Sequence, residues 1–361
     1  MKHRFLNIRG KRLLNSGQIE LAINYFKKSL AINPNFFEAN YNLGFSYHQL
    51  GQLDLAVRSY KKSVLVNPTL AMRHNNKILS VIYLFMEGLF PDALDTLNEL
   101  IQQNPNDAML FNMMGGCYTK TNQIDRAIQS YKLAIRLKPN YSVPIHMLNS
   151  LTGFTSKEPP KEYVRNLFDD YAESYDDSLL NHLEYNLPFI IKEMILKVDN
   201  RTKSFEKAID LGCGTGLAGK DLKSICAKLT GIDISENMVN RAKKLNIYNN
   251  FYIGDIVENL ILIKDKYDLF VSLDVLIYIG DLNSIFNAIR KRCNKNALFV
   301  FSVETQDKGY SLLKNSRYAH SHKYIIETSE KNFDLVVSQN VKLRKEGSNW
   351  IEGKVYILRA S

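Results

Sequence analysis

The chain has 361 residues, with 47 Lys and Arg against 37 Asp and Glu, giving a formal net charge of +10 at pH 7. Apolar residues make up 45% and charged residues 23%, which excludes a wholly disordered chain, and the length predicts about two domains. Residues 1–150 contain 17 basic and 9 acidic residues, whereas residues 151–361 contain 30 and 28, so the two parts differ in character. The basic surplus is compatible with an acidic partner such as nucleic acid.

Cysteines and apolar runs carry little information about targeting or metals. The four cysteines are scattered without a CxxC pair, so we expect neither a zinc site nor a disulfide framework, and no metal. The N-terminal residues contain no apolar signal-like run, and no stretch is long enough to span a membrane. We therefore predict a cytoplasmic protein with reduced thiols.

The first part of the chain is an internal repeat. Prolines recur at intervals of 34, 37 and 34 residues, at Pro34, Pro68, Pro105 and Pro139. An alanine precedes each proline by twelve residues, and a large side chain follows each alanine by four. Glycine or asparagine recurs in one turn register, at Gly17, Gly51, Gly88 and Asn122. The pattern predicts stacked helix–turn–helix units in which the turn residue is left-handed and the proline ends the second helix.

This pattern resembles the tetratricopeptide repeat over about residues 3–141. We expect an α-solenoid domain at 1–151 with four repeats and a capping helix near Tyr141–Leu151, bent after Pro68 where three extra residues follow. In that family the first helices line a groove for a protein or peptide. The resemblance implies that the groove contains Tyr41, Phe45, His48, Ile82, Phe85 and Asn112. Many lysines fall instead on the second helices, which suggests a solvated outer surface and no nucleic-acid partner.

Residues 152–160, with Pro159-Pro160, predict a linker, and a second domain is expected at 161–361. Helical spacing over Val164–Tyr171, Leu179–Leu183 and Tyr185–Val198 indicates short helices that could cover a pocket. Tyr171 is a candidate cofactor contact in this lid.

A strand, glycine turn and helix follow at Phe205–Gly216, with the sequence FEKAIDLGCGTG. Glycines allow a ligand to approach the backbone, and the helix N-terminus offers free N–H donors. Two cofactors fit this unit: a dinucleotide, through a GxGxxG match, or S-adenosylmethionine (SAM). Asp210 at the strand end would repel a pyrophosphate but suits the ammonium group of SAM, so SAM is favoured.

Three further strand-like segments end at acids: Asp233, Asp255 and Asp274. In an open α/β sheet such ends meet in one crevice, so the acids are expected to converge. Asp233 can accept hydrogen bonds from ribose hydroxyls, a feature that NAD and SAM share, and Asp255 from the adenine amino group.

These stretches resemble the class I SAM-dependent methyltransferases over about residues 160–361, and the whole chain resembles bacterial predicted methyltransferases that carry tetratricopeptide repeats. The resemblance implies a Rossmann-like, seven-stranded α/β sheet ending in an antiparallel hairpin, expected at Phe333–Val341 and Trp350–Ala360. It implies cofactor contacts from Asp210, Gly212, Cys213, Gly214, Gly216, Asp233, Ile234, Met238, Asp255, Ile256 and Leu273.

For the chemistry, Asp274, Tyr278 and His320 are candidate catalytic groups, since a base is needed when the acceptor carries a proton of high pKa. His320 is expected on a helix with Arg317 and Tyr324 on the same face. Neither a (D/N)PP(Y/F) loop nor a Pro-Cys nucleophile occurs, so a small molecule or a protein is the expected acceptor. The leading hypothesis is methyl transfer with repeats that recruit a partner or assemble subunits. The alternatives are a non-catalytic SAM-binding adaptor and an NAD(P)-dependent oxidoreductase.

Overall fold

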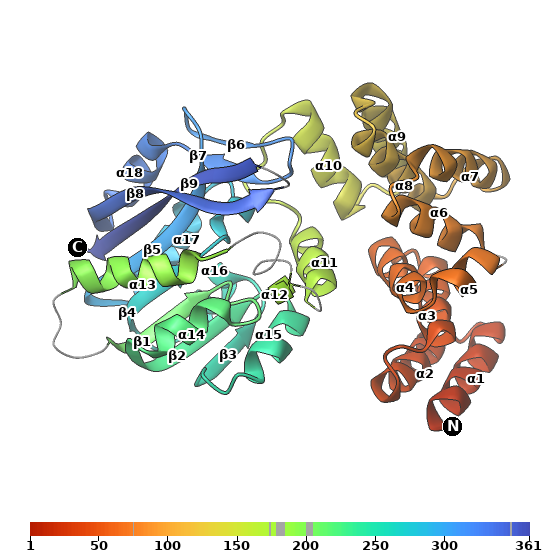
Figure 1. Cartoon of the computed structure of the whole chain (residues 1–361), viewed down its shortest axis with the longest axis horizontal. Helices are drawn as coiled ribbons and strands as arrows, with labels where there is room; N and C mark the ends of the chain where they lie inside the picture. Colours follow the sequence, from red (N-terminus) through yellow and green to blue (C-terminus); the bar gives the residue numbers. More distant parts are fainter. Residues whose placement is uncertain (75, 173–174, 178–184, 200–204, 347–348) are drawn as a thin grey trace. The chain divides into compact units, whose positions relative to one another are not determined.

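A computed structural model describes the chain except residues 75, 173–174, 178–184, 200–204 and 347–348 (Figure 1). It divides into two compact units, Met1–Thr152 and Gly153–Ser361, which are taken in turn below. The predicted helix at Leu179–Leu183 and the tip of the predicted C-terminal hairpin lie outside the described residues.

The first unit is entirely helical over its described residues. Its helices are α1 (Lys2–Asn15), α2 (Ile19–Ile32), α3 (Phe37–Gln49), α4 (Leu53–Val66), α5 (Pro68–Arg73), α6 (Lys77–Met86), α7 (Phe90–Gln103), α8 (Ala108–Lys120), α9 (Ile124–Leu137) and α10 (Ser142–Thr152). The pairs α1–α2, α3–α4, α6–α7 and α8–α9 are the four predicted repeats, and α10 is the predicted capping helix. The turn residues of the pairs have positive φ, including 57° at Asn122, which confirms the predicted left-handed turns.

Each repeat is held together by a small residue against a large one. A Cβ on Gly10 would lie 2.6 Å from a ring carbon of Phe26, and a Cβ on Gly44 would lie 2.7 Å from a ring carbon of Tyr60. Glycine is therefore required for the two helices to approach this closely. In the third repeat Val81 replaces the glycine and Leu97 replaces the aromatic residue, and both are buried. A larger residue on one helix is thus accompanied by a smaller one on the other.

The extra residues after Pro68 form a short additional helix, α5. Pro68 is its first residue, where a missing N–H costs nothing, and Asn67 caps it by accepting a hydrogen bond from the Leu70 N–H at 2.9 Å. The interruption predicted at this point of the array is therefore an inserted helix between the second and third repeats.

The second unit is an α/β fold. Its strands are β1 (Phe205–Leu211), β2 (Cys226–Asp233), β3 (Asn250–Ile253), β4 (Tyr267–Ser272), β5 (Cys293–Thr305), β6 (Tyr310–Leu312), β7 (Tyr318–His320), β8 (Phe333–Glu346) and β9 (Asn349–Ala360). The first five are parallel in the order β3-β2-β1-β4-β5, and β9 then runs antiparallel to β5 and pairs with β8. These seven strands form the predicted sheet and hairpin. Two short strands are additional: β7 pairs with the end of β5, and β6 pairs with β7.

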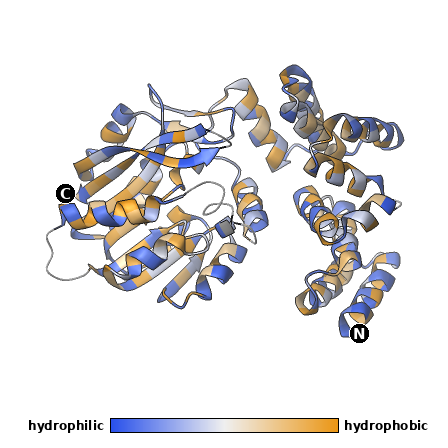
Figure 2. Ribbon diagram, viewed as in Figure 1, coloured by the Kyte–Doolittle hydropathy of each residue, from blue (hydrophilic) through white to orange (hydrophobic). Residues whose placement is uncertain are grey.

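Helices cover both faces of this sheet. They are α11 (Lys161–Tyr171), α12 (Tyr175–Asp177), α13 (Leu187–Val198), α14 (Leu217–Lys223), α15 (Glu236–Lys243), α16 (Ile256–Leu262), α17 (Asn283–Arg292) and α18 (His322–Ser329). Alternate strand residues enter two separate cores: Leu269 packs with the residues of α13 and α14, whereas Phe270 packs with those of α16 and α17. The helices show the corresponding hydrophobic and hydrophilic stripes in Figure 2. Burial of the later residues of β1, β2 and β4 on both faces explains apolar side chains such as Ile209, Ile232 and Phe270, although each strand also carries polar residues.

Candidate functional site

The glycine loop joins β1 to α14. Gly212, Gly214 and Gly216 have φ values of 75°, 53° and 91°, which disfavour any residue with a Cβ. A Cβ on Gly212 would also lie 2.2 Å from Cγ2 of Val275, so the loop packs closely against the segment after β4. Gly216 precedes the first residue of α14 and sets the direction of that helix.

Asp210 lies beneath this loop and is almost completely buried. The Tyr248 hydroxyl donates a hydrogen bond to its Oδ2 at 2.6 Å. Burial raises the pKa of Asp210 to about 7, although the Tyr248 hydrogen bond acts against this rise. Asp210 and Cys213 line a small cavity of about 30 Å³. Several residues of the loop line this cavity and the larger one described next.

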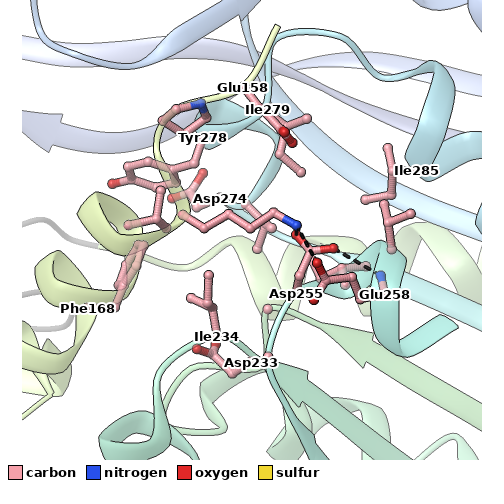
Figure 3. Close-up of a pocket in the computed structure, with 18 of the residues that line it drawn as sticks. Glu158, Phe168, Asp233, Ile234, Asp255, Glu258, Asp274, Tyr278, Ile279 and Ile285 are labelled. Carbon is pink, nitrogen blue, oxygen red and sulfur yellow. Dashed lines mark hydrogen bonds and ion pairs between the residues drawn. The ribbon is translucent and has the colours of Figure 1, made fainter. Parts of the chain in front are cut away.

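The larger cavity, about 370 Å³, lies at the carboxyl ends of the parallel strands (Figure 3). Nine of the predicted site residues line it: Gly212, Gly214, Asp233, Ile234, Asp255, Ile256, Leu273, Asp274 and Tyr278. Acids that follow or end β2, β3 and β4 therefore meet at one cavity, as the sequence predicts for strand ends of an open sheet.

Asp233 is held by backbone donors. Its Oδ2 accepts from the Gly214 N–H at 2.8 Å, and its Oδ1 accepts from the Ser235 N–H at 2.8 Å. Burial raises the pKa of Asp233 to about 6. A carboxylate has about four lone-pair sites, so these backbone donors do not exhaust its capacity to accept from a ligand hydroxyl.

Asp255 caps α16, because its Oδ1 accepts from the Glu258 N–H at 3.0 Å. Its Oδ2 lies 3.4 Å from Nζ of Lys161, which also contacts Oε1 of Glu258 at 2.8 Å. Figure 3 shows Asp255 and Glu258 beside each other at the cavity, and Lys161 also lines it. Lys161 is not identifiable from the sequence, since nothing in its local pattern separates it from a solvated lysine at the start of a helix.

Asp274 follows β4 with a φ of 54°, an unusual value for a residue with a side chain. Its N–H donates to Oγ of Ser302 at 2.9 Å, and its Oδ2 lies 3.2 Å from Nη1 of Arg344. Tyr278 lies nearby on the 3₁₀ turn η2 (Leu276–Tyr278), with its ring 5.0 Å from that of Phe168 in an edge-to-face arrangement.

Helix α11 covers the cavity and is tied to the sheet edge. Oγ of Ser235 donates to Oδ1 of Asp169 at 2.5 Å, and the Asn237 side chain donates to the Asp169 carbonyl at 3.3 Å. Phe168 and Tyr175 line the cavity from this side. Tyr171, the lid residue predicted to contact the cofactor, is 49% exposed and does not line it.

Three other predicted residues also lie away from the cavity lining. Gly216 acts through its backbone conformation, Met238 is fully buried within α15, and His320 is the third.

The predicted helix around His320 is wrong: Tyr318–His320 forms β7, and α18 begins only at His322. All three residues of this strand are buried, so the sequence shows no alternation that would distinguish it from a helix.

His320 is completely buried, and its Nε2 lies 3.0 Å from the carbonyl oxygen of Gly280. Its ring stacks on those of Tyr310 and Tyr324, which also contact each other. Burial lowers the pKa of His320 to about 4, so the ring is neutral near pH 7. Its contacts support the loop at Gly280, whose N–H donates to the Lys157 carbonyl at 2.9 Å.

The first unit has a larger, more open groove of about 1170 Å³. Tyr41, Phe45 and His48 line it, as the repeat resemblance implies. The other three groove residues do not: Ile82 is buried, Phe85 packs against Phe90, and Asn112 donates to the Tyr141 hydroxyl at 3.2 Å. Across this groove, Nε2 of His48 lies 2.9 Å from Oδ2 of Asp107.

Among the described residues, no group of His, Cys, Asp and Glu is arranged to hold a metal ion. Within the same part of the chain, no helix combines the length and apolarity needed to cross a bilayer.

Known proteins match the two units separately. Residues 202–323 match the family described as "Methyltransferase domain". Residues 10–51 match "TPR repeat", and residues 37–70 and 110–141 match "Tetratricopeptide repeat".

Individual relatives are distant. The ubiquinone biosynthesis O-methyltransferase of Pelagibacter ubique is 24% identical over 174 residues, which cover 45% of this chain and 72% of that protein. The magnesium-protoporphyrin O-methyltransferase of Rhodobacter capsulatus is 27% identical over 106 residues, covering 27% of this chain and 46% of that protein. The chain spans only 40–50% of some other curated relatives. A crystal structure of magnesium protoporphyrin IX methyltransferase from Synechocystis PCC 6803 with bound S-adenosylhomocysteine (SAH) matches 56% of this chain and 99% of that one, at 19% identity and a TM-score of 0.44.

The glycine loop, the acids at the strand ends and the antiparallel hairpin agree with the family matches: the chain carries N-terminal tetratricopeptide repeats followed by a SAM-dependent methyltransferase domain of class I fold.

Proposed function

We propose that the second unit binds SAM in the 370 Å³ cavity and transfers its methyl group to a hydroxyl of a small-molecule or protein acceptor. The observation that carries the proposal is the meeting of Asp233, Asp255 and Asp274 with the glycine loop at one cavity. Its volume lies in the range of about 300–1,000 Å³ that small-molecule sites occupy. The named curated relatives are O-methyltransferases, which favours an oxygen acceptor over a nitrogen one.

Three groups of residues fit the parts of the cofactor. Asp233, with lone pairs remaining on both oxygens, would accept from the ribose hydroxyls. Asp255 and Ile256 would contact the adenine edge. The backbone of Gly212–Gly216 would hold the methionine end, and Asp210 would favour its ammonium group over a pyrophosphate.

Cofactor chemistry supplies the reactivity, since a bound sulfonium is a methyl donor without help from the protein. The residues of this chain then have to align the acceptor and exclude water. Phe168 and Tyr175 close the cavity from the lid side. Asp274 and Tyr278 would contact the acceptor, and we assign His320 a supporting role because its Nε2 contacts the Gly280 carbonyl.

For the repeats we propose a partner site in the groove of the first unit. Tyr41, Phe45 and His48 provide aromatic and polar contacts in a groove of about 1170 Å³. A protein partner or a protein acceptor is the kind of ligand that such a surface fits. We propose the boundary between the modules at residues 152–160.

Calorimetric titration of the full chain with SAM, SAH and NAD⁺ tests the proposal. We expect SAM and SAH to bind and NAD⁺ not to bind. Asp233→Ala should weaken SAH binding at least roughly tenfold, because it removes a charged hydrogen-bond acceptor. Asp265→Asn is a matched control, since Asp265 pairs with Lys207 at 2.7 Å and lines neither described cavity of this unit.

Binding of NAD⁺ without binding of SAM would overturn the proposal. Incubation with methyl-labelled SAM and a cell extract then tests turnover. If SAM binds but no small molecule or protein becomes labelled, the adaptor hypothesis replaces the enzymatic one.

A further inference from the structure

A network of buried charges lies directly behind the cavity. Arg344 on β8 is 4% exposed and pairs with three carboxylates. Asp274 lies 3.2 Å from its Nη1, Glu304 on β5 is also 4% exposed, and Oε1 of Glu346 lies farther away, 3.9 Å from its Nε. Removing one partner from a buried ion pair leaves an uncompensated charge, so such an arrangement constrains each of its members.

The network extends away from the cavity. Nε of Arg317 lies 2.9 Å from Oε1 of Glu304, and Arg317 also pairs with Glu346. Two arginines therefore form ion pairs with three carboxylates. Unlike Arg344, Arg317 forms neither an ion pair nor a hydrogen bond with Asp274.

The end of the network that lines the cavity is incomplete. Asp274 is nine-tenths buried, and its Oδ2 faces Arg344. Its Oδ1 is buried with no hydrogen-bond partner among the described residues. Its backbone is fixed in the left-handed region and bonded to Ser302, so the carboxylate cannot turn freely to find a donor. A buried acceptor without a donor is costly, which indicates that a ligand supplies one.

We propose that Arg344 is a positioning residue of the methyl-transfer site: by pairing with Oδ2 of Asp274 it holds that carboxylate with Oδ1 directed at the hydroxyl of the methyl acceptor. The inference rests on the proposed function and specifies the acceptor as a molecule that donates an O–H at this point. Charge balance supports it, because the surplus carboxylate of the network disfavours an anionic acceptor group here.

Other groups also face Asp274. They are Arg344 and Glu304, Arg317 before β7, Tyr278 on η2, Tyr175 on α12 and Tyr185 before α13. Burial raises the pKa of Asp274, while Arg344 is the strongest influence in the opposite direction. Loss of Arg344 therefore favours the protonated, uncharged form of Asp274, which would no longer attract a cation.

Sinefungin provides the probe, because it resembles SAM but carries an amine-bearing carbon in place of the methyl-bearing sulfur. Its affinity relative to that of SAH reports on a negative charge next to the methyl position. Both affinities are measured by calorimetry between pH 5.5 and 8.5 on the full-length protein. In the unmodified chain sinefungin should bind roughly tenfold tighter than SAH at pH 8, the size expected of one charged hydrogen bond. Asp274→Asn should abolish this preference.

As pH falls, Arg344→Met should lose the preference at a higher pH than the unmodified chain does, because loss of the arginine raises the pKa of Asp274. Arg344→Lys should restore most of the original profile. Arg317→Met is the matched control and should move the midpoint less, since it removes a partly buried arginine of the same network that forms no ion pair with Asp274. Glu304→Gln should move the midpoint to lower pH, because Glu304 raises the pKa of Asp274.

Equal midpoints for Arg344→Met and the unmodified chain would overturn the inference, as would an undiminished preference in Asp274→Asn. Thermal unfolding establishes that each variant folds. If Arg344→Met does not fold, Arg317→Met and Glu304→Gln still test the electrostatic influence of the network on Asp274. They should move the pH midpoint of the sinefungin preference in opposite directions, and equal midpoints in the two variants would overturn the inference. Failure of SAH to bind the unmodified chain would instead refute the proposed function.

Discussion

Nζ of Lys161 lies 3.4 Å from Oδ2 of Asp255, so the first residue of the lid helix is paired with the carboxylate that we propose contacts adenine. The same ammonium group contacts Glu258 at 2.8 Å. Oδ1 of Asp255 is already used to cap α16, which leaves Oδ2 as the oxygen available to a ligand. If adenine binds as proposed, Lys161 and its amino group compete for this one carboxylate oxygen.

Lys161→Met should strengthen SAH binding about two- to fivefold, because it removes the competing cation but keeps an apolar side chain. The gain is modest, as the Lys161 side chain is 41% exposed and exposed ion pairs contribute little. Calorimetry at low ionic strength measures the effect, and added salt should reduce the difference between variant and parent. Lys207→Met is the control, since Lys207 has a similar exposed pair with Asp265. Weaker binding by Lys161→Met would show that Lys161 contacts the cofactor.

Gly212→Ala should abolish SAH binding and lower the free energy of unfolding by about 2–4 kcal/mol, because steric overlap and a disfavoured φ add together. The new Cβ would lie 2.2 Å from Val275 at a φ of 75°. Chemical denaturation and calorimetry measure the two effects. Gly309→Ala isolates the backbone contribution, since Gly309 has a φ of 60° and no atom within 4 Å of an added Cβ. The double variant Gly212→Ala/Val275→Ala should recover part of the loss. Equal destabilisation by the Gly212 and Gly309 changes would rule out the steric explanation.

How much of this site the sequence predicts depends on whether a residue acts locally. The glycine loop and Asp233 were predictable because a strand, a turn and a helix follow one another within a few residues. Asp274 could be placed at the cavity for the same reason. Arg344 was not identified, because it comes from β8 and meets Asp274 and Glu304 only through the antiparallel return of the hairpin. No local pattern marks a strand arginine as buried.

The lid helix α11 also shows the difference between what a local sequence pattern predicts and what only the fold decides. Helical spacing over Val164–Tyr171 predicts α11, but spacing alone does not tell which of its aromatic residues faces inward. The structure places Phe168 at the cavity and leaves Tyr171 49% exposed. His320 was assigned to a helix because a three-residue strand carries too few positions for alternation to be recognised. Its partner Gly280 lies 40 residues away, so its supporting role is visible only in the fold.

In the repeats, Gly44→Ala should lower the free energy of unfolding by about 1–3 kcal/mol, the usual cost of overpacking. Its Cβ would lie 2.7 Å from the Tyr60 ring. Adding Tyr60→Leu should recover part of this loss, because the third repeat already combines a larger residue, Val81, with Leu97. Gly116→Ala is the control on the fourth repeat: its Cβ would have ordinary contact with Phe85 at 3.5 Å, and alanine favours the helix. Thermal unfolding of the full chain measures all three variants, and no recovery in the double variant would contradict the proposed exchange.

Finally, the buried acids make cofactor binding dependent on pH. Burial raises the pKa of Asp210 to about 7 and that of Asp233 to about 6. Without the cofactor, burial favours the protonated forms of these carboxyls. Their contribution to the free energy of unfolding is therefore present below their unfolded pKa and is lost as pH rises through about 6–7. An ammonium group and ribose hydroxyls favour the charged forms, so SAM binding should release protons and strengthen as pH rises from 5.5 to 7.5. Calorimetry in buffers of different ionisation enthalpy measures the protons released. Asp210→Asn should reduce that number and flatten the pH dependence of unfolding between pH 4 and 7, whereas Asp265→Asn should change neither. Proton uptake on binding would contradict this electrostatic account of the site, because it would mean that the cofactor favours the protonated acids.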